Sequence, residues 1–214
     1  KVVVGKDYRQ TPVFKSEMTH LVFSPTWTLP ETILWEDVIP SIREDEEYLE
    51  KNHMRVLDFQ EEEVDYKKIK WEELEEEDDF PYLIRQSPGD ENPLGRVKFM
   101  FPNEYYIYIH DSPAQNLFSQ DERTFSSGCI RMDKPEEFAA LLLEEVDGWG
   151  EEEILDAMNL EEEKKVELEE VQEVWILYLT IWSNKGTIEV REDIYDMDKK
   201  LGKAMSLPLS NHFL

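Results

Sequence analysis

Apolar and polar residues alternate along several short segments of the chain, which is the pattern of a strand that buries one face. Segment 104–111, EYYIYIHD, is the strongest of these because Tyr and Ile favour strands. The apolar run 174–183 is followed by the turn sequence Asn184-Lys185-Gly186 and by a further strand-like segment at 187–191, so a hairpin is expected there. Other strands are expected at 1–5, 81–86 and 96–101, with an extended, proline-interrupted stretch at 22–30.

Apolar residues three or four positions apart predict helices in three other segments. Residues 31–52 have this spacing, but Pro40 interrupts them, so two short helices are expected rather than one. At 133–146, Asp133 can cap a helix that has Pro135 in its first turn. A third, short helix is expected at 151–158. The buried stripe of the second helix is expected to consist of Phe138, Leu141, Leu142 and Val146.

Segment 53–79 contains mostly charged residues and only scattered apolar ones, which predicts a partly ordered insertion with little core of its own. Short helices combined with antiparallel strands make the expected fold α+β and rich in β-structure. The chain has 214 residues, of which 40% are hydrophobic, and this fits one large domain that carries an insertion.

Acidic residues give the chain a formal net charge of −27, and they are concentrated in two segments. Residues 31–79 hold 20 acidic against 6 basic side chains, and residues 144–173 hold 14 against 2. We interpret both segments as solvated helix faces and surface loops. The charge argues against binding to nucleic acid and against unaided docking on an anionic membrane, since both need clustered Lys and Arg. No apolar run reaches the roughly 18 residues that a membrane span needs.

The residues best suited to chemistry lie between His110 and Arg131. Cys129 is the single cysteine, so the chain forms no internal disulfide, and as a nucleophile it needs a base such as His110 to remove its proton. Gly128 has no Cβ and lets a reacting carbonyl approach, while the amides of Gly128 and Cys129 can face a developing oxyanion. Arg131 adds a positive charge that can lower the pKa of the thiol or hold a substrate carboxylate.

Each of these residues also has a purely structural interpretation. A lone Cys is often a small buried hydrophobe, a His at a strand end is often simply hydrogen-bonded, and Ser126-Ser127-Gly128 is also a common turn sequence. The four histidines have no ligand-like spacing and the chain has no glycine-rich phosphate loop. We therefore expect no metal site and no cofactor.

The order of several motifs resembles the L,D-transpeptidases of the YkuD fold, and among them the large periplasmic enzymes of the YcbB type. The motifs cover almost the whole chain: VVVGKDYRQTPVF at 2–14, SPTWTLP at 24–30, NPLGRVKFMFPN at 92–103, YIHDSP at 108–113, NLF at 116–118, SSGCIRM at 126–132 and REDIYDMD at 191–198. The resemblance implies one catalytic domain over residues 1–214, a β-rich sheet or sandwich with short helices, and a helical capping subdomain inserted at about 31–91 as a mobile lid. It also implies that the first strand or strands of the family domain are missing before Lys1.

The reaction that the resemblance implies is transpeptidation of peptidoglycan through a cysteine acyl-enzyme. Cys129 attacks a tetrapeptide donor stem and releases D-Ala, and the side-chain amine of a second stem then accepts the acyl group, which gives a 3→3 cross-link. His110 is the base, Asp111 orients the imidazole through its backbone carbonyl, and the amides of Gly128 and Cys129 form the oxyanion hole. Substrate contacts are implied for Arg131, Ser127, Ser126, Tyr108, Trp27 and Asn116.

Two alternatives to transpeptidation stay open. An L,D-carboxypeptidase that hydrolyses the same donor would use the same residues, and a non-catalytic wall-binding module is the alternative outside enzymes. Many family members have His at the position of Ser127, whereas the YcbB type has Ser. The resemblance further implies peptidoglycan stem peptides as partners, carbapenems as covalent inhibitors and a periplasmic location in the bacterial envelope, with any membrane contact made by a region outside this chain.

Overall fold

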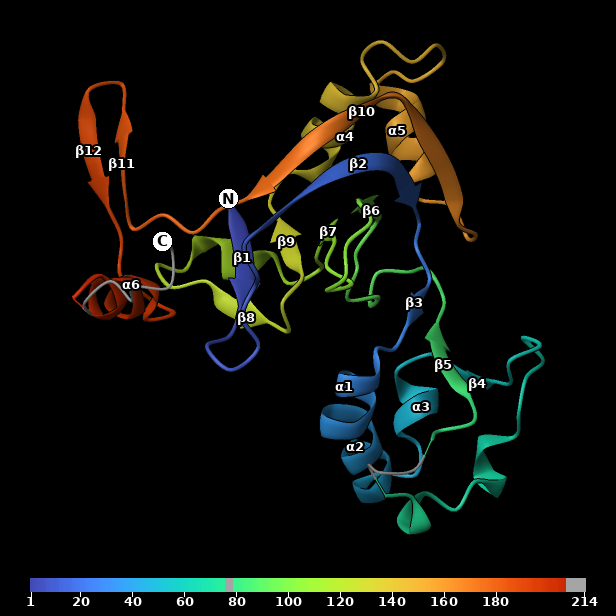
Figure 1. Cartoon of the computed structure of the whole chain (residues 1–214). Coiled ribbons are helices and arrows are strands. Elements are labelled where there is room, and N and C mark those ends of the chain that lie inside the picture. The colour runs from blue at the N-terminus through green and yellow to red at the C-terminus, as the bar shows by residue number, and fades with distance from the viewer. Residues whose placement is uncertain (76–78, 207–214) are drawn as a thin grey trace, which may run out of the picture.

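The fold is built around a seven-stranded mixed sheet (Figure 1). This computed structural model describes residues 1–75 and 79–206. The expected strands at 1–5 and 96–101 are present as β1 (Val2–Gly5) and β6 (Val97–Met100), and the β-rich α+β class is confirmed. The strand order in the sheet is β10 (Lys164–Ile176), β2 (Phe14–Phe23), β6 (Val97–Met100), β7 (Ile109–His110), β9 (Ile130–Met132), β1 (Val2–Gly5) and β8 (Thr124–Ser126).

Helices α4 (Pro135–Leu142) and α5 (Glu151–Ala157) cover one face of this sheet. The ring of Phe138 on α4 lies 4.9 Å from that of Phe99 on β6, and Leu21 on β2 is fully buried in the same cluster. Burying a large apolar side chain contributes about 1.5–3 kcal/mol to stability. This cluster therefore makes the sheet a rigid base for residues on its other face.

A second unit, which we call the insert (residues 31–91), lies beyond the opposite face of the sheet (Figure 1). It contains α1 (Glu31–Ile33), η1 (Leu34–Val38), α2 (Ile39–Glu44), α3 (Tyr48–Lys51), β4 (Met54–Leu57), η2 (Tyr66–Lys68), η3 (Trp71–Glu73) and β5 (Leu83–Gln86). β5 pairs with β4 on one side and with β3 (Trp27–Thr28) on the other, so the expected strand at 81–86 is present.

The insert has a hydrophobic core that comes mainly from residues 34–49 and Ile84, whereas the described part of the charged segment 53–79 adds only Met54 and Val56 to its buried residues. Leu49, Val56 and Ile84 are almost fully buried in a cluster that also contains Trp35 and Ile39. Half-buried residues from the charged segment pack against it. Their spacing follows neither the helical nor the strand period because they lie on short irregular turns, and periodicity analysis misses such residues.

Residues 31–44 form one uninterrupted helical run rather than two separate helices. The five residues of η1 are π-helical, and Pro40 follows in the first turn of α2. Proline lacks the backbone N–H and its ring clashes with the carbonyl four residues earlier in a regular α-helix. A wide π-turn before the proline is a known way of accommodating such a defect. The second expected helix is reduced to α3.

The strand expected at 104–111 is almost absent, because only Ile109 and His110 pair as β7. Asn103 organises the preceding residues into a turn: its side chain donates to the carbonyls of Phe101 (2.8 Å) and Ile107 (2.7 Å). It also accepts from the backbone N–H groups of Tyr105 (3.1 Å) and Ile107 (3.0 Å). An Asn side chain that bonds to nearby backbone competes with strand pairing, and here it overrides strand propensity.

The start of α4 also differs from the sequence-based expectation. Its N-cap is Lys134, in a left-handed conformation with φ 60°, and no side chain caps the helix. Asp133 instead donates its backbone N–H to the carbonyl of Lys1 (2.9 Å), which joins the helix start to the first residue of the chain. In the expected stripe, Leu141 is exposed, and the deeply buried positions are Ala139 and Leu143.

The C-terminal hairpin is present as expected, formed by β11 (Ile181–Asn184) and β12 (Thr187–Val190). Lys185 and Gly186 have φ of 48° and 86°, the positive values that a type I′ turn needs. The acidic segment 144–173 is not only helix faces and loops, because β10 begins at Lys164 and pairs along β2. α6 (Met197–Met205) follows the hairpin, and no helix in the described part of the chain is long and apolar enough to cross a bilayer.

Candidate active site

Two neighbouring parallel strands bring four of the expected site residues together. In the register of β7 and β9, Ile109 lies beside Ile130 and His110 beside Arg131. Because side chains alternate between the faces of a strand, Tyr108 and His110 share a face with Cys129 and Arg131. All four line one cavity of about 890 Å³. Pairing of two segments about 20 residues apart thus places the thiol and the imidazole at one site.

The cavity lies between the sheet and the insert. Its lining includes Trp27 on β3, Pro30 just before the insert, Ile33 within it, and the 126–129 segment with Arg9. Trp27 is half-buried because it also packs against the hydrophobic core of the insert. The insert is therefore in a position to cover a molecule bound at Cys129.

The segment that carries the thiol, which we call the nucleophile loop (residues 126–129), is held by its own side chains. The hydroxyl of the buried Ser126 donates to the carbonyl of Cys129 (2.6 Å) and accepts from the backbone N–H of Gly128 (3.1 Å). Gly128 has φ 111°, a value that L side chains rarely adopt, and a Cβ there would lie 3.1 Å from Cδ1 of Ile107. Gly128 is thus favoured by the backbone conformation, and a larger residue would also need Ile107 to shift slightly.

The two amides expected in the oxyanion hole have different environments. The N–H of Gly128 is donated to Ser126 within the loop, so in this structure it does not face the cavity as a free donor. No described residue accepts a hydrogen bond from the N–H of Cys129. Of the two amides, the N–H of Cys129 is therefore the one that is free to donate a hydrogen bond to a developing negative charge.

The thiol of Cys129 is held in its neutral form. Burial raises the pKa of Cys129 above its usual value, and this effect outweighs the hydrogen bonds with Tyr108 and the charge of Arg131, which act to lower it. Burial also raises the pKa of the Tyr108 phenol. Arg131 alone therefore does not make a standing thiolate, and the thiol needs a base at the moment of attack.

His110 is suited to be that base because its ring is neutral and oriented. It is only 4% exposed, and burial, followed by the charge of Arg131, lowers its pKa to about 4. Its Nδ1 lies 2.5 Å from the carbonyl oxygen of Asp111, and since a carbonyl only accepts, this nitrogen carries the proton. In this tautomer Nε2 is the nitrogen that can take up a proton, and the backbone of Leu94, like that of Asp111, acts to raise the pKa of the ring. His110 and Cys129 share the cavity, and no hydrogen bond joins them among the described contacts.

Asp111 acts on His110 through its backbone rather than its carboxylate. Oδ2 accepts from the backbone N–H of Arg96 (2.8 Å) and Oδ1 from that of Ser112 (2.6 Å). Gly95 makes room for this buried carboxylate, since a Cβ at residue 95 would lie 2.3 Å from Oδ2. The Asp111 side chain thus supports the strand ends around the site.

Arg131 extends a largely buried cation into the same cavity. Burial lowers the pKa of its guanidinium, and its Nε is buried without a hydrogen-bond partner among the described residues. An unpartnered buried donor next to a thiol is suited to accept an anionic or carbonyl group of a bound molecule.

Comparisons with known proteins agree with this geometry. The profile of the YkuD family, described as the L,D-transpeptidase catalytic domain, matches residues 1–165. A Haemophilus influenzae protein that bears the provisional name of an L,D-transpeptidase is 34% identical over 204 residues, which is 95% of this chain. The chain belongs to the YkuD family. It spans 41% of the length of the Haemophilus influenzae relative.

The YkuD domain does not bring every expected residue to the cavity. Asn116 lies on η4 (Gln115–Ser119), is exposed and is not among the residues that line the cavity around Cys129. Its carbonyl accepts from the Ser119 hydroxyl (2.7 Å), so it closes a short turn. Ser127 does lie at the cavity, where its hydroxyl accepts from Nη1 of Arg9 (2.7 Å).

Sequence reasoning gave no role to Arg9 or Thr11, although both lie in the VVVGKDYRQTPVF motif. Thr11 is buried, and its hydroxyl donates to the carbonyl of Gly128 (2.8 Å) while it accepts from the N–H of Gly5 (2.9 Å). The only signal in the sequence was the motif itself, because these contacts depend on the β1–β2 connection lying against the nucleophile loop. No group of His, Cys, Asp and Glu suited to a metal ion occurs among the described residues of the YkuD domain.

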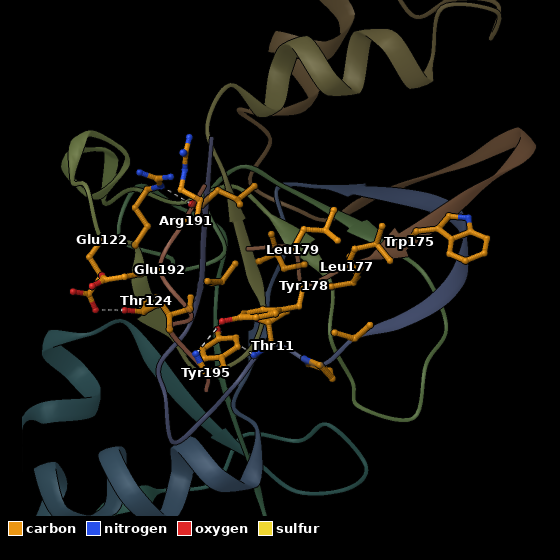
Figure 2. Close-up of a pocket in the computed structure, with 18 of the residues that line it drawn as sticks. Thr11, Glu122, Thr124, Trp175, Leu177, Tyr178, Leu179, Arg191, Glu192 and Tyr195 are labelled. Atoms are coloured by element: carbon orange, nitrogen blue, oxygen red, sulfur yellow. Dashed lines mark hydrogen bonds between the residues drawn. The ribbon is translucent and has the colours of Figure 1, made fainter. Parts of the chain in front are cut away.

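A second cavity of about 530 Å³ lies on the other face of β7 and β9, where Ile109 and Ile130 line it (Figure 2). Figure 2 shows Leu177 and Leu179 on one side and the stacked rings of Tyr178 and Tyr195 below, 5.5 Å apart. None of the described residues that line this cavity is a Cys or His. The candidate active site of the YkuD domain is therefore the cavity that contains Cys129.

Proposed function

We propose that this chain is the catalytic domain of a peptidoglycan L,D-transpeptidase that works through a cysteine acyl-enzyme. The observation that carries the proposal is the placement of Cys129 and the neutral imidazole of His110 in one cavity beneath the insert, next to the unengaged N–H of Cys129. Membership of the YkuD family supports the same reaction and a role at the cell wall. The Ser at position 127 and the insert further favour an enzyme of the periplasmic YcbB type.

The first step is acylation of the thiol. Sγ of Cys129 attacks the carbonyl carbon of the third residue of a tetrapeptide stem, and Nε2 of His110 takes the thiol proton. The N–H of Cys129 stabilises the tetrahedral oxyanion, and one such donor contributes a factor of about 100–1000 in rate. The C–N bond to D-Ala then breaks, and His110 returns the proton to the leaving amine. The products are D-Ala and a thioester on Cys129.

The second step transfers the acyl group to an amine. The side-chain amine of a second stem attacks the thioester carbon, His110 takes a proton from it, and the C–S bond breaks. The proton passes back to the thiolate, so the thiol and the imidazole return to their starting state. The product is a 3→3 cross-link. Exclusion of water by the insert favours the amine over hydrolysis.

Other residues of the cavity bind and orient the donor. The buried guanidinium of Arg131 is suited to the terminal carboxylate or a carbonyl of the stem. Tyr108 and Trp27 provide aromatic side chains in the lining of the cavity. We assign Gly128 a conformational role in presenting the thiol, Ser126 a role in pinning the nucleophile loop, and Ser127 a place at its rim.

Intact-protein mass spectrometry after incubation with a carbapenem tests the acyl-enzyme, since such β-lactams imitate the donor stem. We expect one adduct on the native chain and none on Cys129→Ala, which is a small change that keeps the fold. Circular dichroism of both proteins checks folding. An adduct that survives in Cys129→Ala, or none on the folded native chain, would contradict the assignment.

A second assay identifies the acceptor. The protein is incubated with a disaccharide-tetrapeptide, and products are separated by mass. A cross-linked dimer that has lost one D-Ala supports transpeptidation, whereas tripeptide alone supports the alternative L,D-carboxypeptidase. Neither product, with a folded protein that forms no carbapenem adduct, would support the non-catalytic wall-binding alternative.

A further inference from the structure

The connection between β1 and β2 carries a cation that touches both the insert and the nucleophile loop. Nη1 of Arg9 donates to Oδ2 of Asp37 (3.0 Å) and to the hydroxyl of Ser127 (2.7 Å), and Nη2 pairs with Glu36. Glu36 and Asp37 belong to η1 of the insert, whereas Ser127 lies two residues before the thiol of Cys129. One side chain therefore joins the insert to the loop that carries the nucleophile.

The shape of the contact suits a guanidinium. Glu36 and Asp37 are consecutive residues of a helical turn, so their side chains leave the helix in different directions. The planar fork of Arg carries five donors, and two of its nitrogens reach both carboxylates and the Ser127 hydroxyl, whereas the ammonium of Lys would donate from a single nitrogen. The Arg9 side chain is only 10% exposed, while the Glu36 and Asp37 side chains are 48% and 53% exposed.

The backbone near Arg9 is fixed to the nucleophile loop without its side chain. The N–H of Lys6 donates to the carbonyl of Ser126 (3.0 Å), and the Thr11 hydroxyl donates to that of Gly128 (2.8 Å). Among the ion pairs of the described residues, one other, Arg96–Asp90, joins the insert to the rest of the domain, at the point where the chain leaves the insert. Across the mouth of the cavity, the contact is made by Arg9.

We propose that Arg9 is a positioning residue that clamps the insert over the Cys129 cavity and aligns it with the nucleophile loop through Ser127. The inference rests on the proposed function, because closure serves to hold an acyl donor between Trp27 and Cys129. Opening the insert separates Arg9 from Glu36 and Asp37 and returns all three charges to water. Donor binding therefore depends on whether Arg9 is paired with Glu36 and Asp37.

The first test measures closure without relying on catalysis. Cys129 is alkylated with a small maleimide and with a bulky dye-maleimide, and the ratio of the bulky to the small rate reports how open the cavity is. We expect this ratio to rise on the order of fivefold in Arg9→Met and in the pair Glu36→Gln/Asp37→Asn, the scale of a partly exposed ion pair. Asp45→Asn is the matched control, because it removes an exposed ion pair with Lys51 within the insert.

The second test measures the consequence for donor capture. The rate of carbapenem acylation is measured against concentration, which separates KI from the limiting rate kinact. We expect Arg9→Met to raise KI about tenfold with a small change in kinact, and 0.5 M salt to raise KI of the native chain but not of the variant. Combining Arg9→Met with Glu36→Gln/Asp37→Asn should add no further effect, because both remove the same contact.

The outcomes separate the clamp from the proposed function. An unchanged labelling ratio in both Arg9→Met and Glu36→Gln/Asp37→Asn, each folded by circular dichroism, overturns the clamp. If Arg9→Met does not fold, the exposed pair Glu36→Gln/Asp37→Asn alone decides. A raised ratio together with no carbapenem adduct on the native chain supports the clamp and removes the proposed function.

Discussion

The hydroxyl of Thr11 donates to the carbonyl of Gly128 across 2.8 Å, and this bond orients the peptide that ends in the N–H of Cys129. The carbonyl of Gly128 and the N–H of Cys129 belong to one planar group and point in opposite directions. A bond that holds the carbonyl oxygen of Gly128 in place therefore also fixes the direction of the Cys129 N–H. Tyr195 supports the arrangement from the other side, since its hydroxyl donates to the carbonyl of Gly5 (2.6 Å), whose N–H is bound to Thr11.

Replacement of Thr11 tests this relationship. Thr11→Val removes the hydroxyl at constant shape and leaves the buried carbonyl of Gly128 without its partner, so we expect a loss of about 2 kcal/mol in the free energy of unfolding. Carbapenem acylation should slow about tenfold or more, because the N–H of Cys129 is no longer aimed. Thr11→Ser keeps the hydroxyl and should retain most of the rate. Equal rates for the Val and Ser variants would show that the bond does not serve the reaction.

Removal of the base tests the role of His110. His110→Ala should slow acylation of Cys129 by about 100-fold or more, the usual scale for a lost general base. Because burial holds the thiol of Cys129 protonated, the remaining rate should rise with pH as free thiolate forms. Stopped-flow or mass-resolved acylation between pH 6 and 10 checks both points. An unchanged rate in His110→Ala would remove this residue from the mechanism.

The lowered pKa of His110 also predicts a pH dependence of stability. The imidazole has a pKa of about 4 in the folded chain and of about 6.5 when unfolded, so between these values the unfolded state binds more protons. Stability contributed by neutral His110 is therefore present above about pH 6.5 and is lost as the pH falls toward 4, by about 3 kcal/mol in total. Urea unfolding of the native chain and His110→Gln across this range should show a steeper slope for the native chain. Parallel slopes would contradict the burial argument.

A methyl group at residue 128 tests the space beside the thiol. Gly128→Ala imposes a Cβ at φ 111° and 3.1 Å from Ile107, so we expect a loss of about 1–3 kcal/mol and a strong fall in acylation rate. Gly148→Ala is the matched control, because it also has positive φ (82°) but no atom within 4 Å of the added Cβ. The control should lose some stability and keep the acylation rate. A full acylation rate in Gly128→Ala would argue against the conformational role.

Asn103 offers a test of the turn that replaces the expected strand. Asn103→Ala removes four hydrogen bonds to backbone groups at residues 101–107, and we expect a loss of about 2–3 kcal/mol in the free energy of unfolding. Asn159→Ala is the comparison, since the Asn159 side chain makes one exposed bond, to the carbonyl of Leu155. A similar loss in both variants, measured by chemical unfolding, would show that the Asn103 bonds contribute little.

Several elements were predictable because their signals are local. β1, β6 and the β11–β12 hairpin follow from alternation and from the Lys185-Gly186 turn, which is a property of consecutive residues. The prediction of a strand at 104–111 was wrong because the Asn103 side chain bonds to four nearby backbone groups. The strand propensity of Tyr and Ile takes no account of these competing bonds. The apolar spacing within 31–52 indicated most of the core of the insert, whereas the half-buried residues of 53–79 that pack against it follow no single period.

The sequence by itself determined the family, the thiol at Cys129, the imidazole at His110 and the need for Gly128, because motif order and residue chemistry are readable in one dimension. Only the tertiary structure decided which amide is free and that Arg9 and Thr11 reach the nucleophile loop. These relationships join residues more than 100 positions apart or depend on the direction of a single peptide group. Register and packing set both, and neither leaves a periodic signal in the chain.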